Sequence, residues 1–435
     1  MKVLIVGSGA REHALAWKVR QSPLVDRVYC APGNGGTGDV AENVDIRATD
    51  LRELYKLAKQ ERVDLTVVGP EAPLAAGIVD LFEEGGLRCF GPRARAARLE
   101  SSKVFAKNLM RKHVIPTAEF KVFTQGDEAK AYLRQAYYPL VVKADGLAQG
   151  KGVFVCQTPD EALRAIDRLM VEKEFGDSGG RVIVEECLRG EEVSIHALTD
   201  GHAILVLEDA CDYKRAEDGD RGPNTGGMGA FSPLGITRDP VMRKIEAKVL
   251  VPVVHAMKRE DHPYSGVLYA GLMLTPTGPK VLEFNVRLGD PEAEVLLPRL
   301  KSDIVPLLLS TIEANLSTAE AEWDPRPAVT VVLASAGYPG TYRTGQPIHG
   351  LEKLRGREDV TVFHAGTRRE SFGGEDRFFT AGGRVLAVTA LGETMEAARA
   401  KAYEAVAQIQ FDGMHYRRDI GLGRVKPPAT GGDGD

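Results

Sequence analysis

The chain has 435 residues, of which 43% are hydrophobic and 27% charged, and its formal net charge is -5. This balance is typical of an enzyme that acts on small molecules, and it argues against a nucleic-acid or anionic-membrane partner. At about 150 residues per domain, the length predicts roughly three domains.

The first hundred residues alternate between strand-like and helix-like stretches. These stretches are strands at 2–6, 27–31, 65–68 and 87–90 and a helix at 11–21. Short apolar strands that alternate with crossover helices form an open parallel sheet. We therefore expect an N-terminal α/β domain over residues 1–101.

Ligand-binding turns are expected at the carboxyl ends of these strands, where open parallel sheets bind their ligands. The first turn departs from the dinucleotide fingerprint, because Glu12 stands at its third glycine position and no acid follows the second strand. This argues against a nicotinamide site, but amides at a helix N-terminus still suit a phosphate. The alternative is that these are only tight turns. The candidate residues are Gly9, Arg11, Glu12, Gly33, Asn34, Gly35 and Glu71.

The next module contains a glycine-rich hairpin. Ser101-Ser102-Lys103 opens a helix to about residue 112, and Lys103 is either a solvated lysine or a phosphate ligand. The other predicted elements are a helix at 127–136 and strands at 139–144, 153–156 and 181–187. The turn at 145–152 lacks the P-loop pattern, yet its backbone amides can fold over a polyphosphate. The residues concerned are Lys143, Gly146, Gly150, Lys151 and Gly152.

A long glycine-rich segment at 212–231 is predicted to lack regular structure. Loops of this length inside compact domains are usually functional or disordered, and its apolar flanks favour a functional loop. The elements expected around it are strands at 193–198, 203–208 and 266–274 and helices at 239–255 and 303–316.

The rest of the chain is expected to form a separate αβ domain over 327–423. Its predicted elements are strands at 329–334, 360–364 and 385–389 and a helix at 393–410. The tail at 424–435 has no apolar anchor and is predicted to be disordered. The middle domain then spans 102–326.

The stretch from Lys280 to Glu292 is the most informative part of the sequence. It reads as a strand that ends at a Gly-Asp-Pro turn, so Glu283, Asn285 and Arg287 project from one face. A carboxylate and an amide oxygen two residues apart suit Mg²⁺ bridging substrate phosphates, and the arginine suits an anion. The alternative is a half-buried strand with one solvated face.

Cysteine use and the chain start bear on the compartment. The five cysteines are widely spaced without a Cys-x-x-Cys motif, which suits reduced thiols. A strand begins at Lys2 and leaves no room for a signal peptide, and no apolar run approaches a membrane span. We therefore expect a cytoplasmic protein that meets neither membrane nor nucleic acid and works as a monomer.

Three stretches together resemble the ATP-grasp superfamily and, more narrowly, the phosphoribosylamine–glycine ligase family. They are residues 142–153, 222–233 and 283–292. The resemblance covers almost the whole chain and implies three parts: an N-terminal domain, an ATP-grasp domain with a mobile lid at about 124–190, and a small C-terminal αβ domain. It also implies ATP as co-substrate with Mg²⁺ or Mn²⁺.

The resemblance further assigns roles to residues. It implies phosphate contacts by Lys103, Lys143 and the lid turn, and metal binding by Glu283 and Asn285. Adenine and ribose contacts fall on Glu185, Glu186, Leu188 and Glu192. Many ATP-grasp relatives carry another metal acid about twelve residues upstream, where Tyr269-Ala270-Gly271-Leu272 offers none, so a second ion stays open.

The implied reaction joins glycine to 5-phosphoribosylamine in purine biosynthesis and releases ADP and phosphate through a glycyl phosphate. We expect Arg287, Lys143 and Asp212 to carry the chemistry, with Asp212 preferred over Asp290 for the glycine ammonium. The amino-acid pocket is expected from Asp212, Lys214, Asn224, Thr225, Gly226, Gly227 and Arg287. The alternatives are a carboxylating or formate-using ATP-grasp enzyme and a nucleotide-binding scaffold without chemistry.

Overall fold

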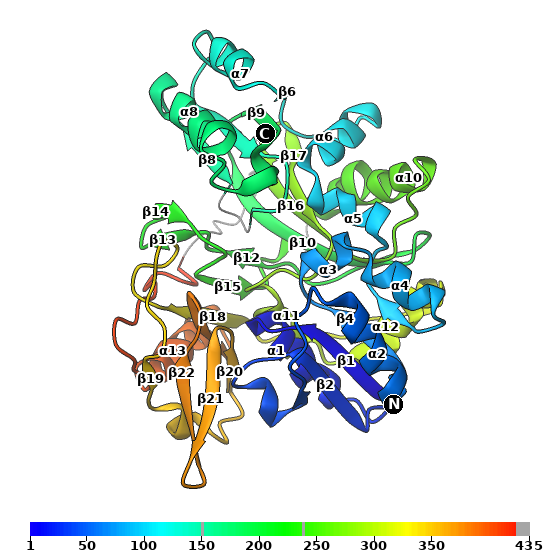
Figure 1. The fold of residues 1–435 in the computed structure, drawn as a ribbon, viewed down its shortest axis with the longest axis vertical. Coiled ribbons are helices and arrows are strands. Elements are labelled where there is room, and N and C mark those ends of the chain that lie inside the picture. Colours follow the sequence, from blue (N-terminus) through cyan, green and yellow to red (C-terminus); the bar gives the residue numbers. More distant parts are fainter. Residues whose placement is uncertain (149–151, 237–239, 423–435) are drawn as a thin grey trace, which may run out of the picture.

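The computed structural model describes residues 1–148, 152–236 and 240–422 (Figure 1). The tail expected at 424–435 and the turn residues Gly150 and Lys151 lie outside the described residues. Within the described ranges, no helix is long and apolar enough to cross a membrane. All five cysteines are free thiols.

The N-terminal part is the predicted parallel sheet. Its strands, in the order β3-β2-β1-β4-β5, are β1 (Lys2–Gly7), β2 (Arg27–Pro32), β3 (Glu42–Asn43), β4 (Leu65–Val68) and β5 (Cys89–Phe90). Its helices are α1 (Ala10–Arg20), α2 (Leu51–Glu61), α3 (Glu71–Ala75) and α4 (Ile78–Glu84). Val3 and Ile5 pack into one core while Leu4 and Val6 pack into another, so β1 is buried on both faces. Burial on both faces explains its unbroken apolar run.

Two helices and a small antiparallel sheet form the upper part in Figure 1. The helices that lead into it are α5 (Ala94–Ser101) and α6 (Lys103–Lys112). We call the sheet the lid sheet; in the order β6-β9-β7-β8 it contains β6 (Phe120–Phe123), β7 (Leu140–Ala144), β8 (Val153–Cys156) and β9 (Val182–Glu186). The helices α7 (Gly126–Leu133) and α8 (Pro159–Ile166) close a core that belongs to this part alone.

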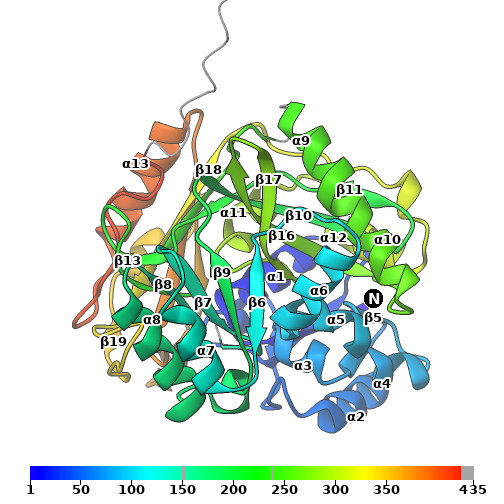
Figure 2. The same ribbon diagram turned by 90° about the horizontal axis from the view of Figure 1, so that it is seen from above.

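A second antiparallel sheet lies beneath the lid sheet (Figure 2). In the order β11-β10-β16-β17 it contains β10 (Glu191–Thr199), β11 (Ile204–Val206), β16 (Gly266–Thr275) and β17 (Gly278–Asn285). The surrounding helices are α9 (Pro240–Ile245), α10 (Val251–Arg259), α11 (Ala293–Arg299) and α12 (Ile304–Ile312).

The predicted helix at 239–255 is helical throughout its described residues, but a π-helical turn at Glu246–Leu250 lies between α9 and α10. Pro252 stands in the first turn of α10, and its missing N–H leaves an earlier carbonyl without its helical partner. The residue at 239 lies outside the described part of the chain.

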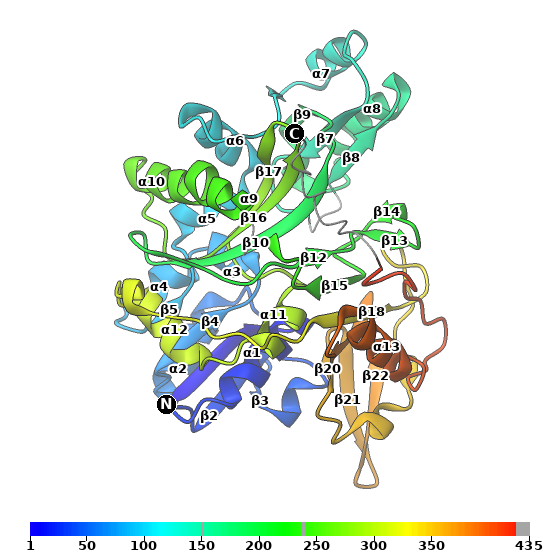
Figure 3. The same cartoon turned by 180° about the vertical axis from the view of Figure 1, so that it is seen from behind.

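The expectation of an unstructured segment at 212–231 is wrong. This segment contains a hairpin of β13 (Arg215–Glu217) and β14 (Arg221–Asn224), flanked by β12 (Cys211–Asp212) and β15 (Gly229–Ser232). β15 pairs with β18 (Ala328–Ala334), about a hundred residues later, so the strand pattern depends on distant chain (Figure 3). Its glycines concealed the alternation that normally marks a strand.

The C-terminal part completes that shared sheet. In the order β12-β15-β18-β23-β20, its own strands are β18, β20 (Val360–His364) and β23 (Arg384–Leu391), covered by α13 (Met395–Val406). The strands β19 (Pro347–Ile348), β21 (Thr367–Phe372) and β22 (Glu375–Thr380) form a separate sheet that the sequence reading missed. The β21–β22 hairpin projects away from the rest of the molecule (Figure 1).

Candidate active site

The end of β17 organises the candidate site. The pairing of β16 with β17 shifts between Gly271↔Glu283 and Leu272↔Val281, so Leu282 forms a bulge just before Glu283. Asn285 Oδ1 accepts a hydrogen bond from Arg287 Nη2 at 3.2 Å, which places these two side chains on one side. A Cβ at position 271 would lie in ordinary van der Waals contact with Glu283, 3.4 Å from its Cγ.

Glu283 is surrounded by cations from separate segments. Burial opposes its ionisation, but the charges of Lys214, Lys103, Lys143 and Arg287 lower its pKa below the ordinary value. These cations come from four places in the fold: α6, β7, the turn after β12 and the segment after β17. Such a ring attracts a polyanion far more strongly than it attracts one carboxylate.

The lysines reach this point through the lid sheet and α6. Lys143 Nζ donates to the carbonyl of Leu282 at 3.2 Å, which joins β7 to the bulge of β17. Lys103 Nζ donates to the carbonyl of Gly146 at 3.3 Å, in the turn after β7. Asp145 in the same turn accepts from the amide of Val104 at 2.8 Å and so caps α6 together with Ser102.

Glu185 lies inside the lid sheet rather than at an open edge. Its Oε2 lies 2.9 Å from Lys143 Nζ, and its Oε1 lies 3.1 Å from Lys107 Nζ, with all three side chains almost fully buried. The sequence analysis did not identify Lys107 as a site residue, although it stands four residues after Lys103 on the same helix. That helical spacing is the one signal that pointed to it.

The remaining residues expected around adenine and ribose lie at the junction of β9 and β10. Glu186 pairs with Lys280 of β17 at 2.8 Å, and Leu188 is half-buried between the strands. Glu192 pairs with Lys214 at 3.2 Å. In the lid turn at 145–152, the carbonyl of Gly152 accepts a hydrogen bond from the amide of Ala144 at 2.9 Å.

Asp212 of β12 and Lys214, two residues later, interact electrostatically. Burial opposes the charge of Lys214, but Asp212, Glu192, Tyr269 and Glu283 raise its pKa well above the ordinary value. Asp212 is 7% exposed and comes from β12. Tyr269 donates to Glu292 at 2.6 Å, so the site continues into a buried polar network that the sequence reading did not find.

Arg287 links this site to the N-terminal sheet. Its Nη2 donates to Glu100 at 2.8 Å, and its Nε lies 3.5 Å from Glu71 without an aligned hydrogen bond. Arg11 donates to Glu12 at 2.7 Å and to the carbonyl of Leu288 at 3.2 Å. The first and third N-terminal turns therefore meet the segment that follows β17.

The second N-terminal turn is fastened to the C-terminal part. The side-chain amide of Asn34 donates to the carbonyls of Ser8, Gly9 and His364, and its oxygen accepts from the amides of Gly36 and Thr37. The neighbouring Gly35 amide donates to the carbonyl of Thr367 at 3.1 Å. Gly33 has a φ of +72°, and a Cβ there would lie 2.2 Å from Asn43. These contacts connect the turn to the C-terminal part of the chain.

The 224–227 segment is held by Tyr338 and Arg384 of the C-terminal part and lies against Pro291. Gly226 donates to the hydroxyl of Tyr338 at 2.9 Å, and its carbonyl accepts from Arg384 at 2.9 Å. Gly227 has a φ of +117°, and a Cβ there would lie 2.4 Å from Pro291. Thr225 Oγ1 donates to the carbonyl of Lys214, while Asn224 lies on β14 and pairs with β13.

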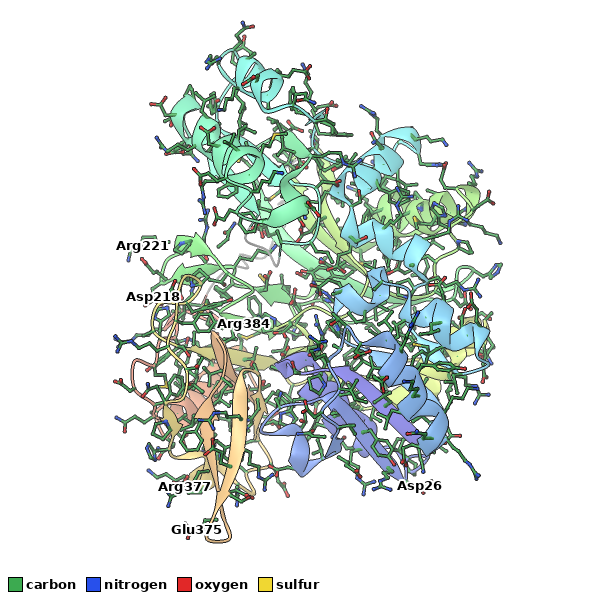
Figure 4. The ribbon with its side chains drawn as sticks, viewed as in Figure 1. Asp26, Asp218, Arg221, Glu375, Arg377 and Arg384 are labelled. Atoms are coloured by element: carbon green, nitrogen blue, oxygen red, sulfur yellow. The ribbon has the colours of Figure 1, made fainter. Side chains whose placement is uncertain are left out.

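Arg384 is a further residue that the sequence reading missed. It lies at the inner end of the C-terminal part, far from Glu375 and Arg377 on the β21–β22 hairpin (Figure 4). Besides Gly226, it contacts Asp290, with 3.0 Å to both the carbonyl oxygen and Oδ1. No local motif marks it, because its partners stand 94 and 158 residues earlier in the chain.

Comparisons with known proteins agree along the chain. Residues 1–100, 101–293 and 328–423 match the N domain, the ATP-grasp (A) domain and the C domain of phosphoribosylglycinamide synthetase. The phosphoribosylamine–glycine ligase of Rhodopirellula baltica is 53% identical over 425 residues, which cover 96% of each chain.

Solved structures give the same result. The crystal structure of phosphoribosylamine–glycine ligase from Thermotoga maritima has a TM-score of 0.82 and 35% identity, and the match covers 96% of this chain and 100% of that one. The biotin carboxylase domain of the Hydrogenobacter thermophilus 2-oxoglutarate carboxylase, solved with MgADP, has a TM-score of 0.70 at 16% identity, with 95% and 91% covered. The second likeness concerns the fold alone.

Proposed function

The chain belongs to the phosphoribosylglycinamide synthetase family, and we propose how its own residues carry out the family's reaction. It is an ATP-dependent ligase of purine biosynthesis that joins glycine to 5-phosphoribosylamine. The observation that carries the assignment of the site is Glu283 among Lys214, Lys103, Lys143 and Arg287. An ionised carboxylate within a ring of cations suits a metal-bound triphosphate and few other ligands.

Lys103, Lys143 and the lid turn face the phosphates of ATP in this proposal. Lys103 is held by the carbonyl of Gly146 in the turn after β7, and Lys143 is held by the carbonyl of Leu282 in β17. The charges of both lysines act on Glu283. Gly146 and Gly152 let the turn approach closely, and Gly150 and Lys151, outside the described residues, are assigned to the same phosphates. The strand end with Glu185, Glu186 and Leu188 meets adenine, and Glu192 takes the ribose hydroxyls.

Glu283 and Asn285 are the proposed metal ligands, and their hard oxygen atoms fit Mg²⁺ or Mn²⁺. Among the described residues, no three His, Cys, Asp or Glu side chains gather into a metal cage. Phosphate oxygens and water would complete the coordination. A bound ion neutralises charge that accumulates on the transferred phosphoryl group. Arg287 donates to Asn285 and orients its oxygen.

Glycine is proposed to bind between Arg287 and the 212–227 segment. Its carboxylate must approach the γ-phosphorus against a repulsion of about 4 kcal/mol at roughly 4 Å and an effective dielectric near 20. Arg287 offsets this repulsion, while Asp212 accepts the ammonium group. Gly226 and Gly227 close the pocket at positions where a Cβ would meet Arg384 and Pro291.

Phosphoribosylamine is proposed to bind at the N-terminal turns. Gly9, Arg11 and Glu12 stand at the start of α1, whose amides suit the single phosphate. Glu71 suits the ribose hydroxyls. Because the polar atoms of Asn34 are engaged by the protein, we assign the turn with Gly33, Asn34 and Gly35 to shaping this pocket rather than to side-chain contacts.

The reaction needs no covalent enzyme intermediate. The carboxylate of glycine attacks the γ-phosphoryl group, and the amine of phosphoribosylamine then displaces phosphate from the glycyl phosphate. Lys143 and Arg287 stabilise the charge that develops in each step. The small-molecule substrates, a monomeric state and a cytoplasmic location complete the proposal.

A test measures ADP release with each substrate omitted in turn. We expect full turnover only with glycine, phosphoribosylamine and ATP together, and a poor rate when alanine replaces glycine. Bicarbonate or formate in place of glycine is the control for a different ATP-grasp reaction. Equal ligation of alanine would show that the 224–227 segment is not the wall of the amino-acid pocket.

A further inference from the structure

A buried lysine stands behind the residues that face the nucleotide. The Lys107 side chain on α6 is 3% exposed, and its Nζ lies 3.1 Å from Glu185 Oε1. It also donates to Thr117 Oγ1 at 2.7 Å. The contact with Glu185 is an ion pair without an aligned hydrogen bond, since Oε1 has no hydrogen-bond partner. No step of the proposed reaction uses this lysine.

The charges of this group do not balance. Glu185 is shared by Lys107 and Lys143, whose ammonium groups lie on different oxygens of the carboxylate. Two lysines around one glutamate leave one net positive charge. If Lys143 alone faced Glu185, the pair would be neutral and would attract phosphate weakly. Burial of Lys107 lowers its pKa to about 8 despite the opposing charge of Glu185, so the arrangement is costly to maintain.

The same lysine also connects three structural elements. Thr117 donates onward to the carbonyl of Val281 at 2.6 Å, while Lys143 donates to the carbonyl of Leu282 at 3.2 Å. Lys107 therefore reaches two consecutive residues of β17, directly before Glu283, by two routes. One route passes through the lid sheet and the other does not. A change in Lys107 acts on both the charge and the position of Lys143.

We propose that Lys107 is a positioning residue for nucleotide binding, which shares Glu185 so that Lys143 keeps its positive charge directed at the phosphates. It touches neither ATP nor the metal ligands. The inference rests on the proposed function, because it takes a nucleoside triphosphate as the ligand of Lys143.

The first test measures the Kd of a non-hydrolysable MgATP analogue by titration calorimetry. Lys107→Met retains the length of the side chain without its charge, and we expect its Kd to rise about tenfold. In the steady state, the KM for ATP should rise similarly while the KM for glycine stays unchanged. Lys107→Arg should restore most of the affinity. Lys112→Met, at an exposed position of the same helix, is the matched control.

The second test repeats the substitution in a Glu185→Gln background. If Lys107 acts by offsetting Glu185, removing its charge there should change the Kd by about twofold or less. A full tenfold loss in that background, or an unchanged Kd for Lys107→Met alone, would overturn the proposal. Should Lys107→Met fail to fold, the Glu185→Gln pair and Lys107→Arg decide the question. A wild-type chain that binds no nucleotide would instead refute the proposed function.

Discussion

At the scale of single residues, the charge around Glu283 is the property that matters most. Its cationic neighbours lower its pKa, so it is ionised at neutral pH and available to a divalent ion. Burial lowers the pKa of Lys103, Glu283 raises it, and the charge of Lys143 lowers it again. The effect of Lys143 shows that these cations repel one another when no polyanion is bound. Binding of a metal-bound triphosphate relieves this repulsion.

Glu283→Gln tests the metal assignment. The amide keeps the shape but weakens binding of the ion, so we expect kcat/KM to fall by roughly a hundredfold or more, partly recovered at high Mg²⁺. The thermal midpoint should change little, because Glu283 faces the site and not the apolar core. Glu375→Gln, on the β21–β22 hairpin, is the control (Figure 4). Near-normal activity at ordinary Mg²⁺ would contradict the assignment.

At the scale of elements, the lid sheet is a semi-independent unit. Its core contains residues of α7, α8, β7 and β9 and is separate from the other cores. Its described links to the site are polar: Asp145 and Glu185 contact α6. Lys143 and Glu186 contact β17. A unit with its own core and a polar attachment can rotate without exposing much apolar surface.

We therefore predict that nucleotide binding orders the lid sheet. Amide hydrogen exchange in β7 and β8 should slow when an ATP analogue with Mg²⁺ is added, because closure brings the sheet onto the phosphates. Exchange in α13, which lies in the C-terminal part, should remain unchanged and serves as the internal control. Equal exchange in β7 and β8 with and without nucleotide would argue against a moving lid.

At the scale of the whole molecule, all three parts contribute to one buried carboxylate. Burial opposes the ionisation of Asp290, but Arg384, Arg11 and Arg287 lower its pKa. These arginines come from the C-terminal, N-terminal and middle parts of the chain. Arg11 also lines the proposed phosphoribosylamine pocket, and Arg287 lines the proposed glycine pocket. Binding of either substrate therefore depends on how the three parts of the chain pack together.

Arg11→Ala tests the assignment of the N-terminal turns. We expect the KM for phosphoribosylamine to rise about tenfold, because a charge-assisted contact to the phosphate is lost, while the KM for ATP stays unchanged. Arg27→Ala, at an exposed ion pair on β2, is the matched control. Its thermal midpoint, compared with that of Arg11→Ala, separates lost binding from lost stability. Weaker ATP affinity with an unchanged amine KM would reverse the assignment.

Much of the local structure followed from the sequence because its cause is local. The alternation of apolar strands and helices predicted the parallel sheet, and the Ser102 cap predicted the start of α6. Side chains two residues apart on a strand share a face, which was enough to group Asn285 with Arg287. The strands of the 212–231 segment escaped prediction because β15 forms only against β18.

By itself the sequence determined the family, the fold class and the candidate ligands along β17, since motif spacing and hydrophobic period are properties of short stretches. The tertiary structure alone decided which charges meet. It placed Lys107 against Glu185 and Arg384 against Gly226 and Asp290, and it turned Asn34 towards the C-terminal part. Such contacts join residues dozens to hundreds of positions apart. No local pattern encodes them, because their energy depends on burial and distance that only the packed chain creates.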